Sequence, residues 1–251
     1  MIIDFLGMPG AGKSTLAVAL NSALKERRVA VTASENGGSA PLGVPPLTKW
    51  ARRRFKAGSL LGNPGLVVAS VSVTLSSGRL GHWPMFVNLC GRDWALRQSK
   101  PEGILLLHES SEHRLCIALA LANKSCLETV KRFLTHMTWP DAVVYLRVDP
   151  ELAVERVRQR LLDLEIEFGA REIAADLNSG WRNRYSQAAE QVIRTLGGQR
   201  PHLILDGASG DAPFLAARVG EWMASLATQE SPYDPDREEV VGVDCTTDRD
   251  R

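Results

Sequence analysis

The feature that most constrains this chain is a glycine-rich loop close to its N-terminus. Positions 7–14 read GMPGAGKS and match the Walker A pattern, GxxxxGK followed by Ser or Thr, at every fixed position. The apolar run Ile2–Leu6 precedes the loop, and a helical pattern that includes Leu16 and Leu20 follows it. A strand, a glycine loop and a helix in this order form the context in which this pattern binds phosphate groups. We therefore expect an α/β fold whose first strand leads into a nucleoside triphosphate site.

Each part of this phosphate-binding loop (P-loop) has a predicted role. The glycines let backbone N–H groups turn toward phosphate oxygens, and the start of the helix adds partial positive charge. Lys13 is predicted to reach the β- and γ-phosphates and to act in catalysis, and the Ser14 hydroxyl to hold Mg²⁺. The implied cofactors are ATP and Mg²⁺. The predicted nucleotide-binding residues of the loop and helix start are Gly7, Pro9, Gly10, Ala11, Gly12, Lys13, Ser14 and Thr15.

Composition narrows the class of protein. The chain has 251 residues, enough for one α/β core with a smaller inserted part. Its net charge of +1 gives no reason to expect nucleic acid or a membrane surface as the main partner. The four cysteines form no CxxC pair and have no histidine at metal spacing, which indicates reduced thiols. Because the apolar stretches are shorter than a membrane span and no signal-peptide pattern is found, we expect a cytoplasmic protein.

Five short apolar runs predict the strands of a parallel sheet. Helical patterns lie between these runs, and this alternation is typical of a sheet with helices on both faces. Ligands bind such sheets at the carboxyl ends of the strands, so the residues after each run are the candidates for chemistry. The five runs are Ile2–Leu6, Val29–Ala33, Ile104–Leu107, Ala142–Val148 and Leu203–Leu205.

The pattern along the chain predicts one domain over residues 1–227. Residues 44–100 contain no strand signal, and prolines and glycines interrupt their first part, so we expect a helical insertion that covers the site. Asp149 is predicted to cap a helix that starts at Pro150. Residues 228–251 are acidic and poor in large apolar side chains, which predicts a disordered tail.

The passage from Trp139 to Arg160 resembles a passage of the thymidylate kinase and deoxynucleoside kinase group of P-loop phosphotransferases, in which PD, a strand and ERxxxR follow one another. Residues 33–38 are similar to the TREPGG turn of thymidylate kinases, and Arg182 with Tyr185 is similar to the group's RxxY. The resemblance covers most of the chain. It implies a five-stranded parallel sheet in the order 2-3-1-4-5, a lid near 156–184 and an acceptor-binding role for the insertion.

The resemblance also implies roles for side chains outside the loop. Arg156 and Arg160 are four residues apart and so share a helical face, from which lid arginines neutralise charge on the transferring phosphoryl group. Glu35 falls where nucleoside kinases carry a glutamate that accepts the proton of the attacking hydroxyl. Glu109, after the third run, is the candidate carboxylate for Mg²⁺ or a water bound to it. The turn Gly207–Ala208 is predicted to lie against adenine.

The acceptor is where the sequence departs from this group. Thymidylate kinases follow the third strand with Asp-Arg-Tyr, whose arginine grips the acceptor phosphate, whereas this chain has Glu109, Ser110 and Ser111. We therefore predict a kinase (EC 2.7 class) that transfers the γ-phosphoryl group of Mg-ATP to a hydroxyl of a nucleoside, sugar or metabolite. A thymidylate-like kinase for nucleoside monophosphates is the first alternative. An ATP-switched binding module without a small-molecule acceptor is the second. The sequence leaves a homodimer open.

Overall fold

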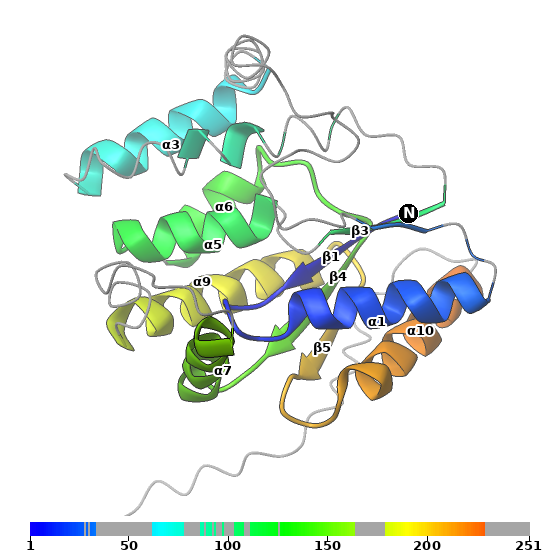
Figure 1. Cartoon of the computed structure of the whole chain (residues 1–251). Helices are drawn as coiled ribbons and strands as arrows, with labels where there is room; N and C mark the ends of the chain where they lie inside the picture. The colour runs from blue at the N-terminus through cyan, green and yellow to red at the C-terminus, as the bar shows by residue number, and fades with distance from the viewer. Residues whose placement is uncertain are drawn as a thin grey trace, which may run out of the picture.

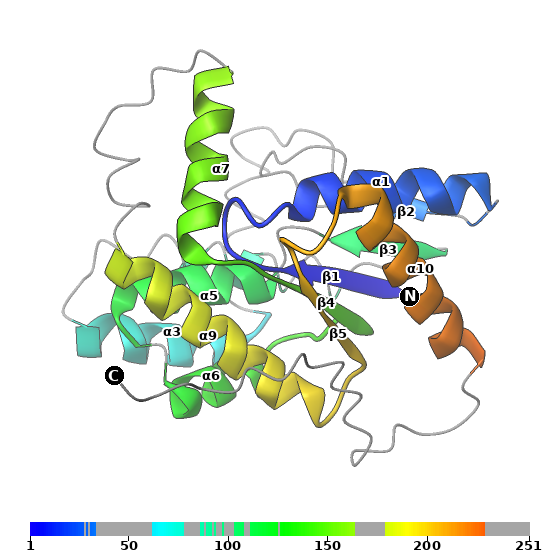
Figure 2. The same ribbon diagram turned by 90° about the horizontal axis from the view of Figure 1, so that it is seen from below.

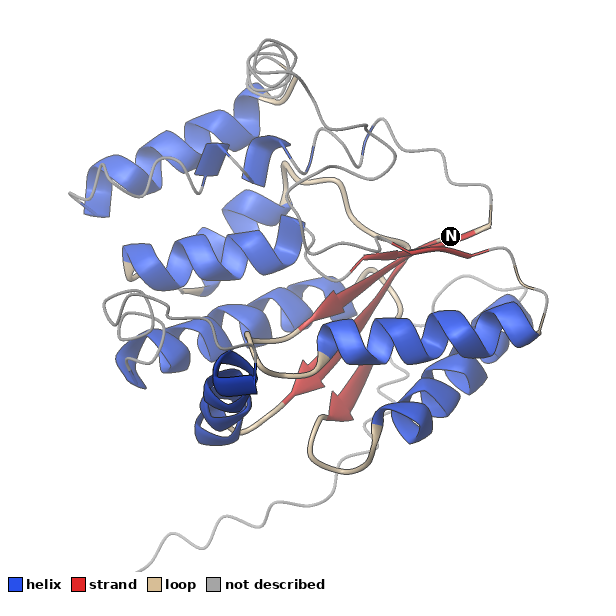
Figure 3. Ribbon diagram, in the orientation of Figure 1, coloured by secondary structure: helices blue, strands red, loops and turns tan. Residues whose placement is uncertain are grey.

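The structure, a computed structural model, describes residues 1–27, 29, 31–33, 62–77, 86–87, 89–91, 93, 97, 103–107, 111–124, 126–163 and 179–228. These residues form an α/β fold in which a parallel sheet lies between helices (Figure 1, Figure 3). The sheet order is β2-β3-β1-β4-β5. The predicted parallel sheet with helices on both faces is therefore confirmed. The strands are β1 (Ile2–Leu6), β2 (Val31–Ala33), β3 (Ile104–Leu107), β4 (Ala142–Arg147) and β5 (His202–Asp206).

Two helical layers enclose the sheet. Helices α1 and α10 pack together on one face, and α5 and α9 pack together on the other, where α6 and α3 extend the layer outward (Figure 1). Helix α7 stands at the edge of the sheet where the strands end (Figure 2). The helices are α1 (Lys13–Glu26), α3 (Pro64–Ser77), α5 (Ser111–Ala122), α6 (Leu127–Leu134), α7 (Pro150–Asp163), α9 (Ser179–Gly197) and α10 (Ala212–Thr228).

The central strands explain why the sequence reads as short apolar runs. β1 and β4 pair with each other and are buried almost throughout, because helices cover both faces of the sheet. Strand β3 matches its predicted bounds, and β4 ends one residue before the predicted Val148. The two edge strands, β2 and β5, differ more from their predicted bounds. Strand β2 begins at Val31 rather than Val29, because the N–H of Val29 bonds to the Leu24 carbonyl (3.0 Å) and so completes the end of α1.

Strand β5 is longer than its apolar run. The run Leu203–Leu205 is only its centre, since His202 pairs with Val143 and Asp206 pairs with Arg147 in the parallel ladder. The ladder uses main-chain groups, so polar side chains at the two ends of an edge strand do not interrupt it. The hydrophobic pattern therefore understates the length of this strand.

The described residues of the predicted insertion are mostly helical. The helical residues are α3 and those described among positions 86–97, and Gly62 and Asn63 precede α3 without helical structure. The buried Asp93 carboxylate accepts hydrogen bonds from Asn63 Nδ2 (2.9 Å), Arg97 Nε (2.9 Å) and the Thr138 N–H. Asn63 and Arg97 also donate to the His136 carbonyl, at 2.6 and 2.7 Å. This network attaches the insertion to the segment that leads into β4.

Some predicted segments lie outside the described residues, and the predictions for them stand untested. These are most of residues 44–61 and 78–100, the middle of the predicted lid at 164–178, and the tail from 229, since α10 extends to Thr228. Across the described helices, none combines the length and the apolar character that crossing a membrane requires.

The N-terminus of α7 has the predicted cap. Asp149 Oδ1 accepts the N–H groups of Glu151 (2.7 Å) and Leu152 (3.3 Å), and the Asp149 carbonyl accepts the N–H of Ala153 (2.9 Å). We expect Asp149→Ala to lower the free energy of unfolding by about 1 kcal/mol, because two N–H groups lose their acceptor. Urea denaturation measures this loss. Asp149→Ser, which keeps an acceptor oxygen, should recover most of it, and equal stability of both variants would contradict the capping role.

Candidate functional site

The P-loop joins β1 to α1 at the edge of the sheet where the parallel strands end (Figure 2). Its middle is enclosed by backbone. Gly10 has φ +88°, and a Cβ placed there would overlap the Ala153 carbonyl oxygen at the start of α7. On the other side, a Cβ on Gly207 would lie 3.2 Å from the Ala11 carbonyl oxygen. The loop is thus held between α7 and the turn that follows β5.

The enclosure of Gly10 gives a testable consequence. We expect Gly10→Ala to lose both stability and nucleotide binding, since the positive φ alone costs about 1–3 kcal/mol and the Ala153 backbone leaves no room for a methyl group. Thermal unfolding and nucleotide titration would show the loss. Gly198→Ala is the matched control, because no atom lies within 4 Å of its added Cβ, and we expect a change within about 0.5 kcal/mol. A Gly10→Ala variant as stable as this control would contradict the packing described.

The start of α1 is suited to an anion. Gly12 is the N-cap residue with φ +95°, no side chain caps the helix, and its first turn contains no acidic residue. The first N–H groups of a helix lack intrahelical partners, and the helix dipole adds partial positive charge there. Ser14 and Thr15 are exposed in this turn. This end of α1 is therefore suited to a phosphate group, and the predicted contact of the exposed Ser14 hydroxyl with Mg²⁺ stays a prediction.

Lys13 lies folded back over the loop. Its ammonium Nζ donates to the carbonyls of Gly7 (2.6 Å) and Met8 (3.0 Å), and the residue is 7% exposed. An ammonium group has three N–H donors in a roughly tetrahedral arrangement, so two bonds to main-chain carbonyls fix its position and direction. This geometry is compatible with the predicted role of Lys13 toward the phosphates, which remains a prediction.

Two acidic side chains are fully buried in the core near Cys116. Asp4 in β1 and Glu112 in α5 are both 0% exposed. Burial raises the pKa of the neighbouring Cys116 thiol, Glu112 and Asp4 raise it further, and Lys13 opposes them. The side chains of Asp4, Glu112 and Lys13 thus lie near one thiol. Sequence reasoning missed Asp4 and Glu112, although a charged residue inside an apolar strand was a usable signal for Asp4.

A buried tyrosine also contacts the loop. The Tyr185 hydroxyl donates to the Gly7 carbonyl (2.8 Å) and lies 2.7 Å from His113 Nδ1. Both side chains are almost fully buried, at 1% and 4% exposure. Burial raises the pKa of Tyr185 well above its ordinary value, so the hydroxyl keeps its proton. Sequence reasoning noted Tyr185 only through the RxxY resemblance and did not select His113.

Of the two predicted lid arginines, Arg156 and Arg160, the structure describes the side chain of Arg156 alone. Arg156 is half-buried, and its Nη2 donates to the Gly207 carbonyl (3.1 Å), which places it at the turn after β5. The side chain of Arg160 lies outside the described residues. Arg158, with an exposed side chain, pairs with Glu155 at 3.0 Å on the outer face of α7. Contact of Arg156 or Arg160 with a phosphoryl group stays a prediction.

The turn after β5 is built closely against the loop. The Gly207 N–H bonds to the Arg147 carbonyl (2.7 Å), and the Ala208 N–H bonds to Asp206 Oδ1 (2.9 Å). Gly207 is buried and Ala208 is exposed, so one position supports the loop while the other is accessible to a ligand. The predicted contact of this turn with adenine is not tested by these bonds.

The two predicted acidic groups, Glu35 and Glu109, lie outside the described residues. The strands before them end at the same edge of the sheet as β1, since Ala33 pairs with Leu106 and Leu107 pairs with Asp4. The described residues contain no group of three or more His, Cys, Asp or Glu side chains arranged to hold a metal ion. Ser14 and Glu109 as ligands of Mg²⁺ stay predictions.

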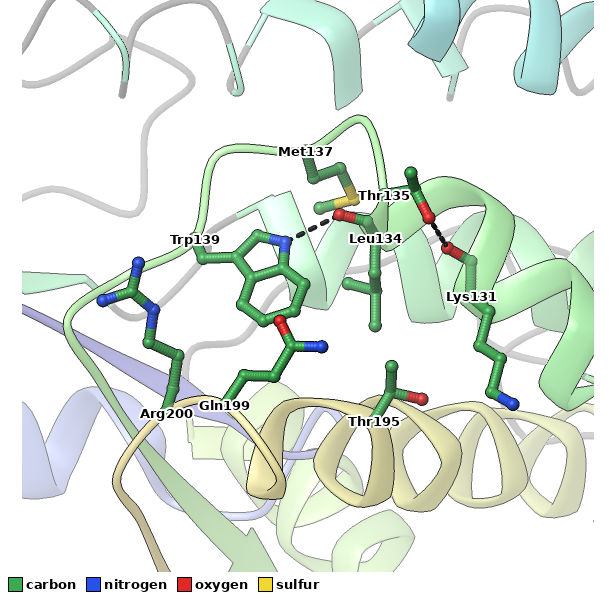
Figure 4. Close-up of a pocket in the computed structure, with 8 residues that line it drawn as sticks. All are labelled: Lys131, Leu134, Thr135, Met137, Trp139, Thr195, Gln199 and Arg200. Carbon is green, nitrogen blue, oxygen red and sulfur yellow. Dashed lines mark hydrogen bonds between the residues drawn. The ribbon is translucent and has the colours of Figure 1, made fainter. Parts of the chain in front are cut away.

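A hollow of about 720 Å³ lies at the end of the sheet where β4 and β5 begin (Figure 4). It lies between α6, α9 and the segments that lead into the starts of β4 and β5. The Trp139 side chain lines this hollow, and its Nε1–H donates to the Leu134 carbonyl (2.7 Å). Because ligands bind parallel α/β sheets where the strands end, we do not place the nucleotide here. Its lining residues are Lys131, Leu134, Thr135, Met137, Trp139, Thr195, Gln199 and Arg200.

No protein-family profile matches the chain, and no curated protein matches it. Its structure is similar to solved structures of a deoxyadenosine kinase from M. mycoides. With bound dATP, that enzyme matches at 14% identity and a TM-score of 0.51, covering 89% of this chain and 100% of the enzyme. With bound dCTP the values are 14% identity, a TM-score of 0.50, and 90% and 100% coverage. At this identity the similarity establishes the fold alone, which is a parallel α/β sheet with helices on both faces.

Proposed function

We propose that this protein is an ATP-dependent kinase that transfers the γ-phosphoryl group of Mg-ATP to a small molecule. The observation that carries the proposal is the P-loop, where Lys13 is held over the loop by two carbonyls and the start of α1 has no side-chain cap. Phosphate oxygens are the ligands that such an arrangement attracts. The predicted cytoplasmic location is part of this proposal.

The P-loop explains binding of a nucleoside triphosphate but does not by itself imply transfer. Support for transfer comes from the ERxxxR pattern on α7 and from the fold, which this chain shares with a deoxyadenosine kinase. Positioning and electrostatic stabilisation perform most of the catalysis in phosphoryl transfer. In the proposed reaction Lys13, Arg156 and Arg160 stabilise the charge of the transferring group, and Ser14 and Glu109 hold Mg²⁺.

For the acceptor we favour a hydroxyl group, as in a nucleoside, a sugar or another metabolite. The chain has Ser110 where thymidylate kinases carry the arginine that grips an acceptor phosphate. It retains Glu35 two residues after β2, where a carboxylate can accept the proton of an attacking alcohol. A monophosphate acceptor already carries a negative oxygen and gains little from such a base.

The experiment that tests this function measures ADP release by the purified protein with Mg-ATP. The candidate acceptors are nucleosides, nucleoside monophosphates and sugar-like alcohols, each compared with a reaction that contains no acceptor. Stimulation by a nucleoside or another alcohol would support the proposal. Stimulation by nucleoside monophosphates alone would replace the hydroxyl acceptor with a phosphate acceptor. Slow ADP release that no small molecule changes would favour the ATP-switched binding module.

A further inference from the structure

The Gly7 carbonyl at the start of the P-loop receives two hydrogen bonds. One comes from Lys13 Nζ (2.6 Å) and the other from the Tyr185 hydroxyl (2.8 Å). A carbonyl oxygen has two lone pairs, so these donors occupy both acceptor positions. The lysine comes from the helix that follows the loop, whereas Tyr185 comes from α9, which lies far away in the sequence. The orientation of this carbonyl therefore depends on both.

The proton positions in this group follow from counting donors. The Tyr185 hydroxyl has one proton, which it gives to the Gly7 carbonyl. The contact between Tyr185 Oη and His113 Nδ1 (2.7 Å) then requires a proton on Nδ1, which donates to the hydroxyl oxygen. The result is a directed chain from His113 through Tyr185 to Gly7. Each hydrogen bond in such a chain polarises and strengthens the next.

The ring of Tyr185 has little freedom to move. His113 and Trp181 flank it with ring centroids 5.7 and 5.6 Å away. The neighbouring turns of α9 are also fixed, because Arg182 Nη1 donates to the Pro150 carbonyl (3.0 Å) and Arg184 Nε donates to the Ala120 carbonyl (2.8 Å). The Tyr185 hydroxyl therefore holds a constant position, and its hydrogen bond constrains the orientation of the Gly7 carbonyl.

We propose that Tyr185, oriented by His113, is a positioning residue for nucleotide binding, because it fixes the Gly7 carbonyl that in turn directs the Lys13 ammonium. This inference deepens the proposed function and rests on it. Tyr185 does not touch the nucleotide in this account. It acts through the carbonyl that it shares with Lys13, so its effect on nucleotide affinity requires the lysine.

The test measures the dissociation constant of Mg-ADP by calorimetry in four proteins: wild type, Tyr185→Phe, Lys13→Met and the double variant. We expect Tyr185→Phe to weaken binding about 2- to 12-fold, which is the effect of one hydrogen bond. In the Lys13→Met background, the same substitution should leave the dissociation constant unchanged. A purely structural tyrosine would lower the melting temperature and give the same effect on affinity in both backgrounds, and that result would overturn the inference.

Tyr145→Phe is the matched control. Tyr145 in β4 is also buried, at 6% exposure, and it pairs with Leu6 through the main-chain ladder between β4 and β1. We expect the Tyr145→Phe variant to bind Mg-ADP as the wild type does. An equal loss in both tyrosine variants would show a general effect of removing a buried hydroxyl and would overturn the positioning role.

His113 variants test the same chain without changing the tyrosine. His113→Leu removes the donor to Tyr185 and should weaken Mg-ADP binding, whereas His113→Asn, whose amide can donate from the same place, should restore affinity. These variants keep the test decisive where Tyr185→Phe fails to fold. Wild-type protein that binds no nucleotide would overturn the proposed function together with this inference. Wild-type binding that neither Tyr185→Phe nor His113→Leu weakens would overturn the inference alone.

Discussion

Lys13→Ala is expected to lower kcat/KM for phosphoryl transfer by at least ~10²–10³, the effect of removing one preorganised donor to developing charge. The structure gives the reason for a large effect, since the ammonium is already directed by the Gly7 and Met8 carbonyls. Because the lysine is already ordered, the reaction does not incur the entropic cost of ordering it in the transition state. Steady-state ADP release, measured with whichever candidate acceptor stimulates the wild-type protein, would measure the loss.

Lys25→Ala provides the control for this prediction. Lys25 belongs to the same helix and is exposed in its last turn, so its removal changes the net charge by the same amount. We expect near wild-type turnover, because an exposed charge far from the loop is screened by solvent. A Lys13→Ala variant that turns over as fast as Lys25→Ala would show that the P-loop lysine does not take part in the reaction.

Glu35→Gln is expected to lower turnover of a hydroxyl acceptor by ~10²–10⁴ while Mg-ATP still binds with unchanged affinity. The substitution keeps the size of the side chain and removes its ability to accept a proton. The argument rests on position, since β2 ends at Ala33 at the same edge of the sheet as the P-loop and Glu35 follows two residues later. Turnover and nucleotide affinity must be measured separately to see the difference.

The matched control for Glu35→Gln is Glu26→Gln, which removes an exposed carboxylate at the end of α1. It should change neither turnover nor affinity. If Glu35→Gln behaves in the same way with an alcohol acceptor, then Glu35 is not the base. Tolerance at Glu35 together with phosphorylation of nucleoside monophosphates would support the thymidylate-like alternative.

Local patterns predicted the central part of the fold well. The Walker A pattern and the four runs around β1, β3, β4 and β5 depend on short-range signals, such as continuous apolar residues in buried parallel strands. The bounds of the two edge strands were predicted less accurately. Strand β2 begins late because Val29 closes the end of α1, and β5 extends past its apolar centre because ladder bonds do not depend on side chains.

The surroundings of the P-loop could be predicted only in part. Asp4, as a charge in an apolar strand, was visible in the sequence, but its burial beside Cys116 and Glu112 depends on how β1 packs against α5. The bond from Tyr185 to Gly7 joins residues that are 178 positions apart. No local pattern encodes such a pair. The role of Arg156 as a lid arginine stays a prediction, and its bond to the Gly207 carbonyl was not predicted.

The sheet order also affects how the chain reaches its folded state during synthesis. Strand β1 is made first, but its two partners are β3 and β4, and the second of these ends only at Arg147. At ordinary translation rates the apolar first strand waits roughly 7–30 s for that partner. Contacts of such long range also slow folding after synthesis. The P-loop therefore gains its contact with Ala153 of α7 late, and a nascent chain that stops before β4 has the Walker A sequence without the site that it specifies.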